Sequence, residues 1–175
     1  LAMVKKNDKI EKIREEIDKK LEKDNVKKRL KENLEGEVYD EAWLKPLLIL
    51  LEYKQTDNSK IEFIDNDKKL QIDHILPKKW EKIDYWKEKW EQSIAIEWLN
   101  KLGNLTLLSD KKNKEASNDS FPNKLEIYKR GKDGTTAFRI TQSILEKKEW
   151  TKTEVSERHD WSIKNILEIL GIEYQ

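Results

Sequence analysis

Apolar residues recur at helical spacing near the start of the chain, with lysine and glutamate on the other faces. This pattern predicts an amphipathic helix over residues 8–34. The stripe consists of Ile10, Ile13, Ile17, Leu21, Val26, Leu30 and Leu34. A glycine at position 36 is expected to end the helix.

A second helix is predicted from Asp40, a residue type suited to a helix N-cap, to about Lys54. Pro46 lies near its first turn, where proline is tolerated. The uninterrupted apolar run at positions 47–51 gives this helix no polar side there, so we expect it to be the buried one.

Alternating polar and apolar residues follow the second helix. Ile61 and Phe63 make one short alternating stretch, and Leu70 and Ile72 make another. Asn-Asp at 66–67 offers a turn between them, so the pattern predicts a β-hairpin.

The middle of the chain is rich in tryptophan and reads as helical over residues 80–101. Gly103 breaks that pattern, and the apolar run at 105–108 predicts a short strand. Ser109 and the following aspartate can cap a short helix that carries Asn113. The tryptophans, expected to be core anchors rather than base-stacking platforms, include Trp80, Trp86, Trp90 and Trp98.

The last third is predicted to be helical, and Thr151 and Glu154 have capping-box spacing before the final helix. His159 lies in that helix beside two charged residues, which favours a solvated surface position. The fold class that results is α+β, predominantly helical, with a small β element in the middle.

Composition narrows the function classes. Charged residues make up 41% of the 175 positions, but 36 basic and 35 acidic residues nearly cancel, so a polybasic protein is excluded. There is no cysteine, which excludes disulfides, thiolate zinc sites and cysteine nucleophiles and fits a cytoplasmic location. No apolar run approaches the ~20 residues of a membrane helix.

Three residues could share a chemical site. Asp73 and His74 are adjacent at a predicted strand end, and Asn113 follows the next strand. A strand–strand–helix unit would bring that helix across the first strand. Asp73 and Asn113 could then each offer one oxygen to a single hard cation, Mg²⁺ or Mn²⁺. His74 could deprotonate a water beside it, and Asn104 could hold the intervening loop.

Each of these residues has an ordinary structural interpretation when taken alone. Most Asp-His pairs are solvated turns, an asparagine after glycine is usually a turn residue, and Asn113 could be an exposed helix residue. The case for a shared site comes from the occurrence of all three in this order, within a predicted strand–strand–helix unit.

Basic residues exceed acidic ones by three between positions 110 and 132, seven against four. This stretch is either an ordinary solvated face or a strip that contacts phosphates and makes binding salt-dependent.

The motifs together resemble a known family. Asp-His-Ile-x-Pro at 73–77 followed by Ser-Asp-Lys-Lys-Asn at 109–113 is similar to the HNH (ββα-metal) nuclease motif. Leu-Gly-Asn-Leu-Thr-Leu-Leu at 102–108, Asn-x-x-x-Ser-Asn at 113–118 and Phe-x-x-Lys at 121–124 resemble the C-terminal domain of GmrS/GmrD modification-dependent restriction enzymes.

The resemblance implies a role for each matching residue. Asp73 and Asn113 would be the metal ligands, His74 the general base and Asn104 the residue that orients the loop. It also implies DNA cleavage that leaves 5′-phosphate and 3′-hydroxyl ends. Residues that could contact substrate or brace the site are Lys111, Lys112, Ser117, Asn118 and Lys124.

We therefore expect an N-terminal helical scaffold (1–58), an HNH core with a helical insertion (59–130) and C-terminal helices (131–175), together one compact unit excerpted from a longer protein. The expected partners are DNA and a nucleotide-hydrolysing N-terminal domain or subunit, with no membrane. The expected function is metal-dependent endonuclease activity in defence against foreign or modified DNA. The alternatives are a catalytically silent DNA-binding or interaction module, and an HNH nuclease of repair, recombination or mobile elements.

Overall fold

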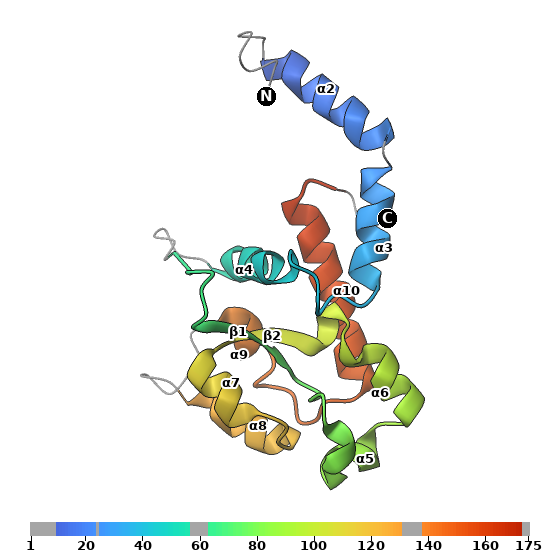
Figure 1. Cartoon of the computed structure of the whole chain (residues 1–175). Helices are drawn as coiled ribbons and strands as arrows, with labels where there is room; N and C mark the ends of the chain where they lie inside the picture. The colour runs from blue at the N-terminus through green and yellow to red at the C-terminus, as the bar shows by residue number, and fades with distance from the viewer. Residues whose placement is uncertain (1–9, 24, 57–62, 131–137, 173–175) are drawn as a thin grey trace.

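The structure, a computed structural model, describes residues 10–23, 25–56, 63–130 and 138–172. It confirms a predominantly helical α+β fold with one small antiparallel sheet (Figure 1). The elements in chain order are α2 (Ile10–Lys23), α3 (Val26–Glu35), α4 (Leu44–Gln55), β1 (Leu70–His74), η1 (Trp80–Lys82), α5 (Asp84–Lys89), α6 (Gln92–Leu99), η2 (Leu102–Asn104), β2 (Leu105–Ser109), α7 (Asp110–Ala116), α8 (Phe121–Lys129), α9 (Arg139–Gln142) and α10 (Lys152–Ile169).

The two strands lie between two apolar clusters. Leu105 and Leu107 of β2 belong to a cluster with α3, α4 and α10, whereas Leu108 belongs to a tryptophan-rich cluster with α5, α6 and α8. Because β2 is covered on both faces, three of its first four residues are leucines, and its apolar and polar residues do not alternate strictly. The sheet therefore forms the centre of the domain.

The predicted hairpin is wrong. β1 pairs with β2, with Asp73 opposite Thr106 and His74 opposite Leu105. Residues 63–69 form no strand, and Phe63 is 83% exposed, while Ile61 lies outside the described residues. The partner that β1 has instead, β2, is buried at its first four positions.

The predicted first helix is two helices. Asn25 separates α2 from α3 with a φ of 50° and a ψ of 33°, a left-handed conformation that asparagine tolerates better than most residues. In Figure 1, α2 extends away from the rest of the domain. Its stripe is accordingly open to solvent, with Ile10 73% exposed.

The predicted helix over 80–101 is divided into η1, α5 and α6. The division lets two of the indoles, those of Trp86 and Trp90, combine apolar packing with a hydrogen-bond acceptor, whereas Nε1 of Trp98 is buried without a partner among the described residues. Trp86 donates through Nε1 to the carbonyl of Asp119 at 2.9 Å, and Trp90 donates to the carbonyl of Trp150 at 2.8 Å. Because Trp80 and Trp86 are buried, they act as core anchors, as predicted, and not as stacking platforms.

The capping box of the last helix is confirmed, but the surface position predicted for His159 is wrong. His159 is buried against the edge of the Trp98 ring, and its Nδ1 accepts a hydrogen bond from the backbone N–H of Gly103 at 3.3 Å. Beside it, Arg158 donates to the carbonyls of Gly103 and Leu105 at 2.9 and 2.8 Å. Together these two side chains fix α10 to the turn that leads into β2.

We predict that Gly103→Ala destabilises the domain by about 3 kcal/mol, because the backbone of α10 leaves no space for a side chain. A Cβ at position 103 would lie 2.2 Å from the carbonyl oxygen of Val155 and 2.8 Å from Cβ of His159. Urea unfolding measures the change. Gly36→Ala is the control, because its Cβ would meet nothing closer than 3.5 Å. Equal stability of the two variants would contradict the packing described.

We also predict that His159 makes the fold sensitive to acid. Burial lowers the pKa of His159 from 6.5 to about 4; nearby Lys101 lowers it further and Asp160 opposes the fall. Between pH 6.5 and pH 4, His159 is therefore protonated in the unfolded chain but largely neutral in the folded chain. The free energy of unfolding consequently falls as the pH drops through this range.

Between pH 7 and pH 5 this histidine should account for a loss of roughly 1 to 2 kcal/mol in the free energy of unfolding. Urea unfolding at both pH values measures the loss in the native protein and in His159→Gln. The variant should show a smaller loss, and an identical pH dependence would refute the assignment.

Candidate active site

A ββα unit carries the candidate site. The side chain of Ser109 caps α7 by accepting from the backbone N–H of Lys112, and α7 packs against both strands. This packing places Asn113 beside the end of β1. Asp73, His74 and Asn113 consequently line one shallow cavity of about 390 Å³, together with Tyr39, Ile72, Pro77, Lys78, Lys114, Ser117 and Asn118.

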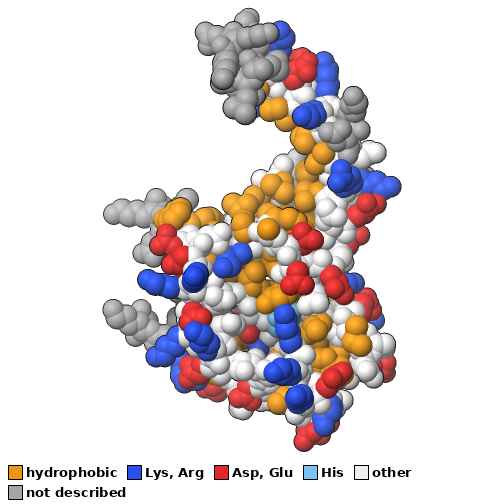
Figure 2. Space-filling view, viewed as in Figure 1, with side chains coloured by type: hydrophobic (Ala, Val, Ile, Leu, Met, Phe, Trp, Pro, Cys, Tyr) orange, Lys and Arg blue, Asp and Glu red, His pale blue; other side chains and the backbone are white. Residues whose placement is uncertain are grey.

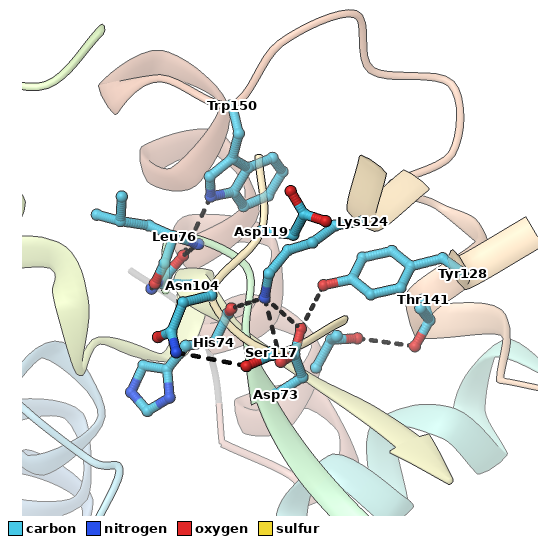
Figure 3. Close-up of polar contacts among 12 residues, drawn as sticks. Asp73, His74, Leu76, Asn104, Ser117, Asp119, Lys124, Tyr128, Thr141 and Trp150 are labelled. Carbon is cyan, nitrogen blue, oxygen red and sulfur yellow. Dashed lines mark hydrogen bonds and ion pairs between the residues drawn. The ribbon is translucent and has the colours of Figure 1, made fainter. Parts of the chain in front are cut away.

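The carboxylate of Asp73 is paired with the buried ammonium of a lysine. Lys124 Nζ lies 3.2 and 3.0 Å from the two carboxylate oxygens of Asp73 and donates to the carbonyl of His74 at 2.5 Å (Figure 3). The hydroxyl of Tyr128 also donates to Oδ2 of Asp73. Burial raises the pKa of Asp73, and the ammonium and the phenol hydroxyl oppose that rise.

His74 is held on two sides. Its Nε2 lies 3.0 Å from Oδ1 of Asn100, and the ring of Tyr39 lies 4.1 Å from the imidazole, centroid to centroid. Burial lowers the pKa of His74 from 6.5 to about 4; the hydrogen bond to Asn100 opposes this fall, and Lys78 and Lys124 add to it. The imidazole is therefore neutral at neutral pH and retains a lone pair that can accept a proton.

Asn104 holds the loop that leaves His74. Its backbone carbonyl accepts from the N–H of Ile75 at 2.9 Å, and Oδ1 accepts from the N–H of Leu76 at 2.7 Å. Nδ2 donates to the carbonyls of Leu76 and Leu99, and Trp150 donates to Oδ1. These contacts match the loop-holding position expected of Asn104, although it does not touch the imidazole itself.

The residues expected to contact substrate divide into two groups. Lys111 and Ser117 are exposed on and just after α7, and Asn118 accepts from the backbone N–H of Lys79 at 3.1 Å. Lys124, in contrast, is fully buried, so it cannot reach a phosphate and instead braces Asp73. Lys112 is half-buried and donates to the carbonyl of Tyr128 at 2.8 Å, which turns it away from the cavity.

The predicted basic strip is weaker than its sequence suggests. Ion pairs join Lys114 to Asp110, Arg130 to Glu115 and Lys129 to Glu126, and Lys132 lies outside the described residues. Over the face seen in Figure 2, basic and acidic side chains are intermingled. Of the two lysines that line the cavity, Lys78 takes part in none of these ion pairs and is the better candidate for contacting phosphate, whereas Lys114 shares its charge with Asp110.

Two residues of the site gave no usable signal in the sequence. Tyr39 is one of two aromatic residues between α3 and α4, and nothing in the local pattern connects it to a site 35 positions later. Asn100 lies four positions before Asn104, and the motif draws attention only to the second asparagine.

The oxygen donors present fit a hard divalent cation. A carboxylate offers about four acceptor positions. The ammonium of Lys124 and the hydroxyl of Tyr128 make three contacts with the carboxylate of Asp73, one to Oδ1 and two to Oδ2. Oδ1 therefore keeps an acceptor position for a cation. The amide oxygen of Asn113 borders the same cavity. No cluster of three His, Cys, Asp or Glu ligands occurs in the described part of the chain, so water would complete the shell, as Mg²⁺ prefers.

Comparison with protein families decides the identity of the domain. A family model for the C-terminal domain of GmrSD restriction endonucleases matches residues 24–164, most of the chain. The chain belongs to this family. A GmrSD C-terminal domain is a nuclease domain of the restriction-endonuclease type. No curated protein matches the sequence. Within the described residues, no helix of this GmrSD domain is long and apolar enough to cross a membrane.

We predict that Lys124→Met lowers the free energy of unfolding by about 3 to 5 kcal/mol, because it leaves the buried carboxylate of Asp73 without its cation. Urea unfolding measures the loss. Lys129→Met, on the exposed side of the same helix, removes a surface ion pair and should change stability by less than about 1 kcal/mol. If the two variants are equally stable, the buried pair does not brace the site.

Proposed function

We propose that this domain is a divalent-metal-dependent DNA endonuclease of the HNH type that hydrolyses phosphodiester bonds in restriction of foreign or modified DNA. The observation that carries the proposal is that Asp73, His74 and Asn113, which come from a strand end and a separate helix, border one solvent-open cavity. The family match supports a nuclease, and the ββα arrangement supports this particular chemistry.

In this mechanism His74 accepts a proton from the water that attacks phosphorus. Its neutral imidazole is already in the form that a base requires, and Tyr39 and Asn100 restrict its orientation. Asp73 and Asn113 would hold one Mg²⁺ or Mn²⁺, which when bound supplies charge stabilisation to the phosphate and the departing oxygen. Lys78 and Lys114 at the rim would attract neighbouring phosphates of the DNA backbone.

A second candidate function is a domain that binds DNA or a partner without cutting. One observation favours it: the carboxylate of Asp73 already has a buried ammonium and a phenol as partners, so the domain does not need a metal to satisfy that charge. The two functions differ in a single property, which is whether metal and DNA together lead to cleavage.

We predict that the protein nicks or linearises plasmid DNA in the presence of Mg²⁺ or Mn²⁺ and that EDTA abolishes the reaction. His74→Ala should lower the rate by about 10²- to 10⁴-fold, the usual contribution of a general base. Lys129→Met, on the far side of α8 and exposed, should cleave like the native protein. Cleavage by His74→Ala at the native rate would exclude His74 as the base.

The assignment of Asn113 as a metal ligand is tested separately, by a binding measurement. Asn113→Ala should weaken Mn²⁺ binding, measured by calorimetry, while leaving the melting temperature close to that of the native protein, because Asn113 is only half-buried. Unchanged Mn²⁺ affinity would remove Asn113 from the site. Metal-independent DNA binding with no cleavage under any condition would establish the silent module instead.

A further inference from the structure

An imidazole that acts as a base must present its unprotonated nitrogen to the water, so its two nitrogens have different roles. The identity of the protonated nitrogen is set by whatever the other side of the ring contacts. In this domain that contact is a side chain outside the motif, and the inference below rests on the proposed role of His74 as the base.

Asn100 supplies the contact. Its Oδ1 lies 3.0 Å from Nε2 of His74, and an amide oxygen can only accept, so the proton of the neutral ring belongs on Nε2. Asn100 is itself fixed, because it is the C-cap of α6 and its backbone carbonyl accepts from the N–H of Val38 at 2.9 Å. The ring of Tyr39 against the imidazole restricts rotation about the side-chain bonds.

The other nitrogen is open. No described residue forms a hydrogen bond with Nδ1 of His74, and this atom is not among the fully buried polar atoms that lack a partner. Nδ1 therefore keeps contact with solvent. His74 lines the cavity whereas Asn100, the partner of Nε2, does not, so Nδ1 is the ring nitrogen available to a water in the cavity.

We infer that Asn100 is a positioning residue, which holds the proton of His74 on Nε2 and thereby keeps Nδ1 unprotonated toward the attacking water. Asn100 touches neither water nor phosphate in this arrangement. Its effect is to keep the ring in one orientation and one tautomer. The opposite orientation of the amide would donate an N–H to Nε2 and place the proton on Nδ1, where it would block the reaction.

Nitrogen NMR of the ¹⁵N-labelled protein at neutral pH tests the tautomer directly, since a protonated ring nitrogen resonates far upfield of a bare one. The chain has only two histidines, so His159→Gln assigns the His74 signals. We expect protonated Nε2 and bare Nδ1 for His74. A protonated Nδ1 in the native protein would overturn the inference without reference to activity.

Asn100→Leu removes the acceptor at similar volume, and Asn100→Asp keeps it. The leucine variant leaves a buried N–H without a partner, so we expect a ring whose orientation or tautomer changes and a kcat lowered about 10- to 100-fold with little change in KM. The aspartate variant should restore both the Nε2–H signal and most of the rate. Asn165→Leu, at a half-buried amide of α10, is the matched control and should cleave normally.

The outcomes separate this inference from the proposed function. If His74→Ala is inactive while Asn100→Leu cleaves at the native rate, the base assignment stands and the role of Asn100 is refuted. If Asn100→Leu loses the Nε2–H signal but the native protein never cleaves DNA, the contact is confirmed and the nuclease function fails. If Asn100→Asp is as impaired as Asn100→Leu although both melt like the native protein, the acceptor is not what matters.

Discussion

The ammonium of Lys124 is the interaction on which the geometry of the site depends. It is fully buried and joins three oxygens of β1, both carboxylate oxygens of Asp73 and the carbonyl of His74. An ion pair of this kind adds little stability relative to apolar packing, but losing one partner is costly, so it fixes α8 against the strand end. The direction in which Asp73 can offer its remaining lone pair is consequently set by a helix that begins 48 positions later.

The segment 102–104 provides the second constraint, and it acts from the opposite side. Asn104 ties this turn to the residues that follow His74, while Arg158 and His159 tie it to α10. Gly103 is needed there because the two backbones approach too closely for any side chain. The position of the loop beside the imidazole therefore depends, through this turn, on the position of α10. The site is held by α8 on one side and, through the turn, by α10 on the other.

Local features of this fold could be predicted from the sequence, and long-range ones could not. The capping box at Thr151, the capped helix α7 and the strand at 105–109 depend on neighbouring residues, and each is present. The predicted hairpin was wrong because the pairing of a strand depends on its packing in the folded core, and the local alternation of polar and apolar residues does not contain that information. The long first helix failed at Asn25, a single residue whose left-handed conformation interrupts an otherwise continuous stripe.

The candidate site divides in the same way. The spacing of the motif was enough to place Asp73, His74 and Asn113 around one cavity, because a strand–strand–helix unit has few ways to fold. The motif could not distinguish an exposed lysine such as Lys111 from Lys124, which is buried under a carboxylate, because the two look alike in a lysine-rich chain. Nor could it find Asn100, whose importance depends on the point where α6 ends.

The residues of the motif are held in place by segments outside it. The ring of Tyr39, from the segment before α4, lies against the imidazole of His74. The 102–104 turn, which holds the loop after His74, is bonded to Trp150 and Arg158 from the C-terminal part. In the proposed nuclease, the segments on either side of the motif would therefore take part in building the site, because they supply the ring against His74 and the hydrogen bonds that hold the 102–104 turn in place.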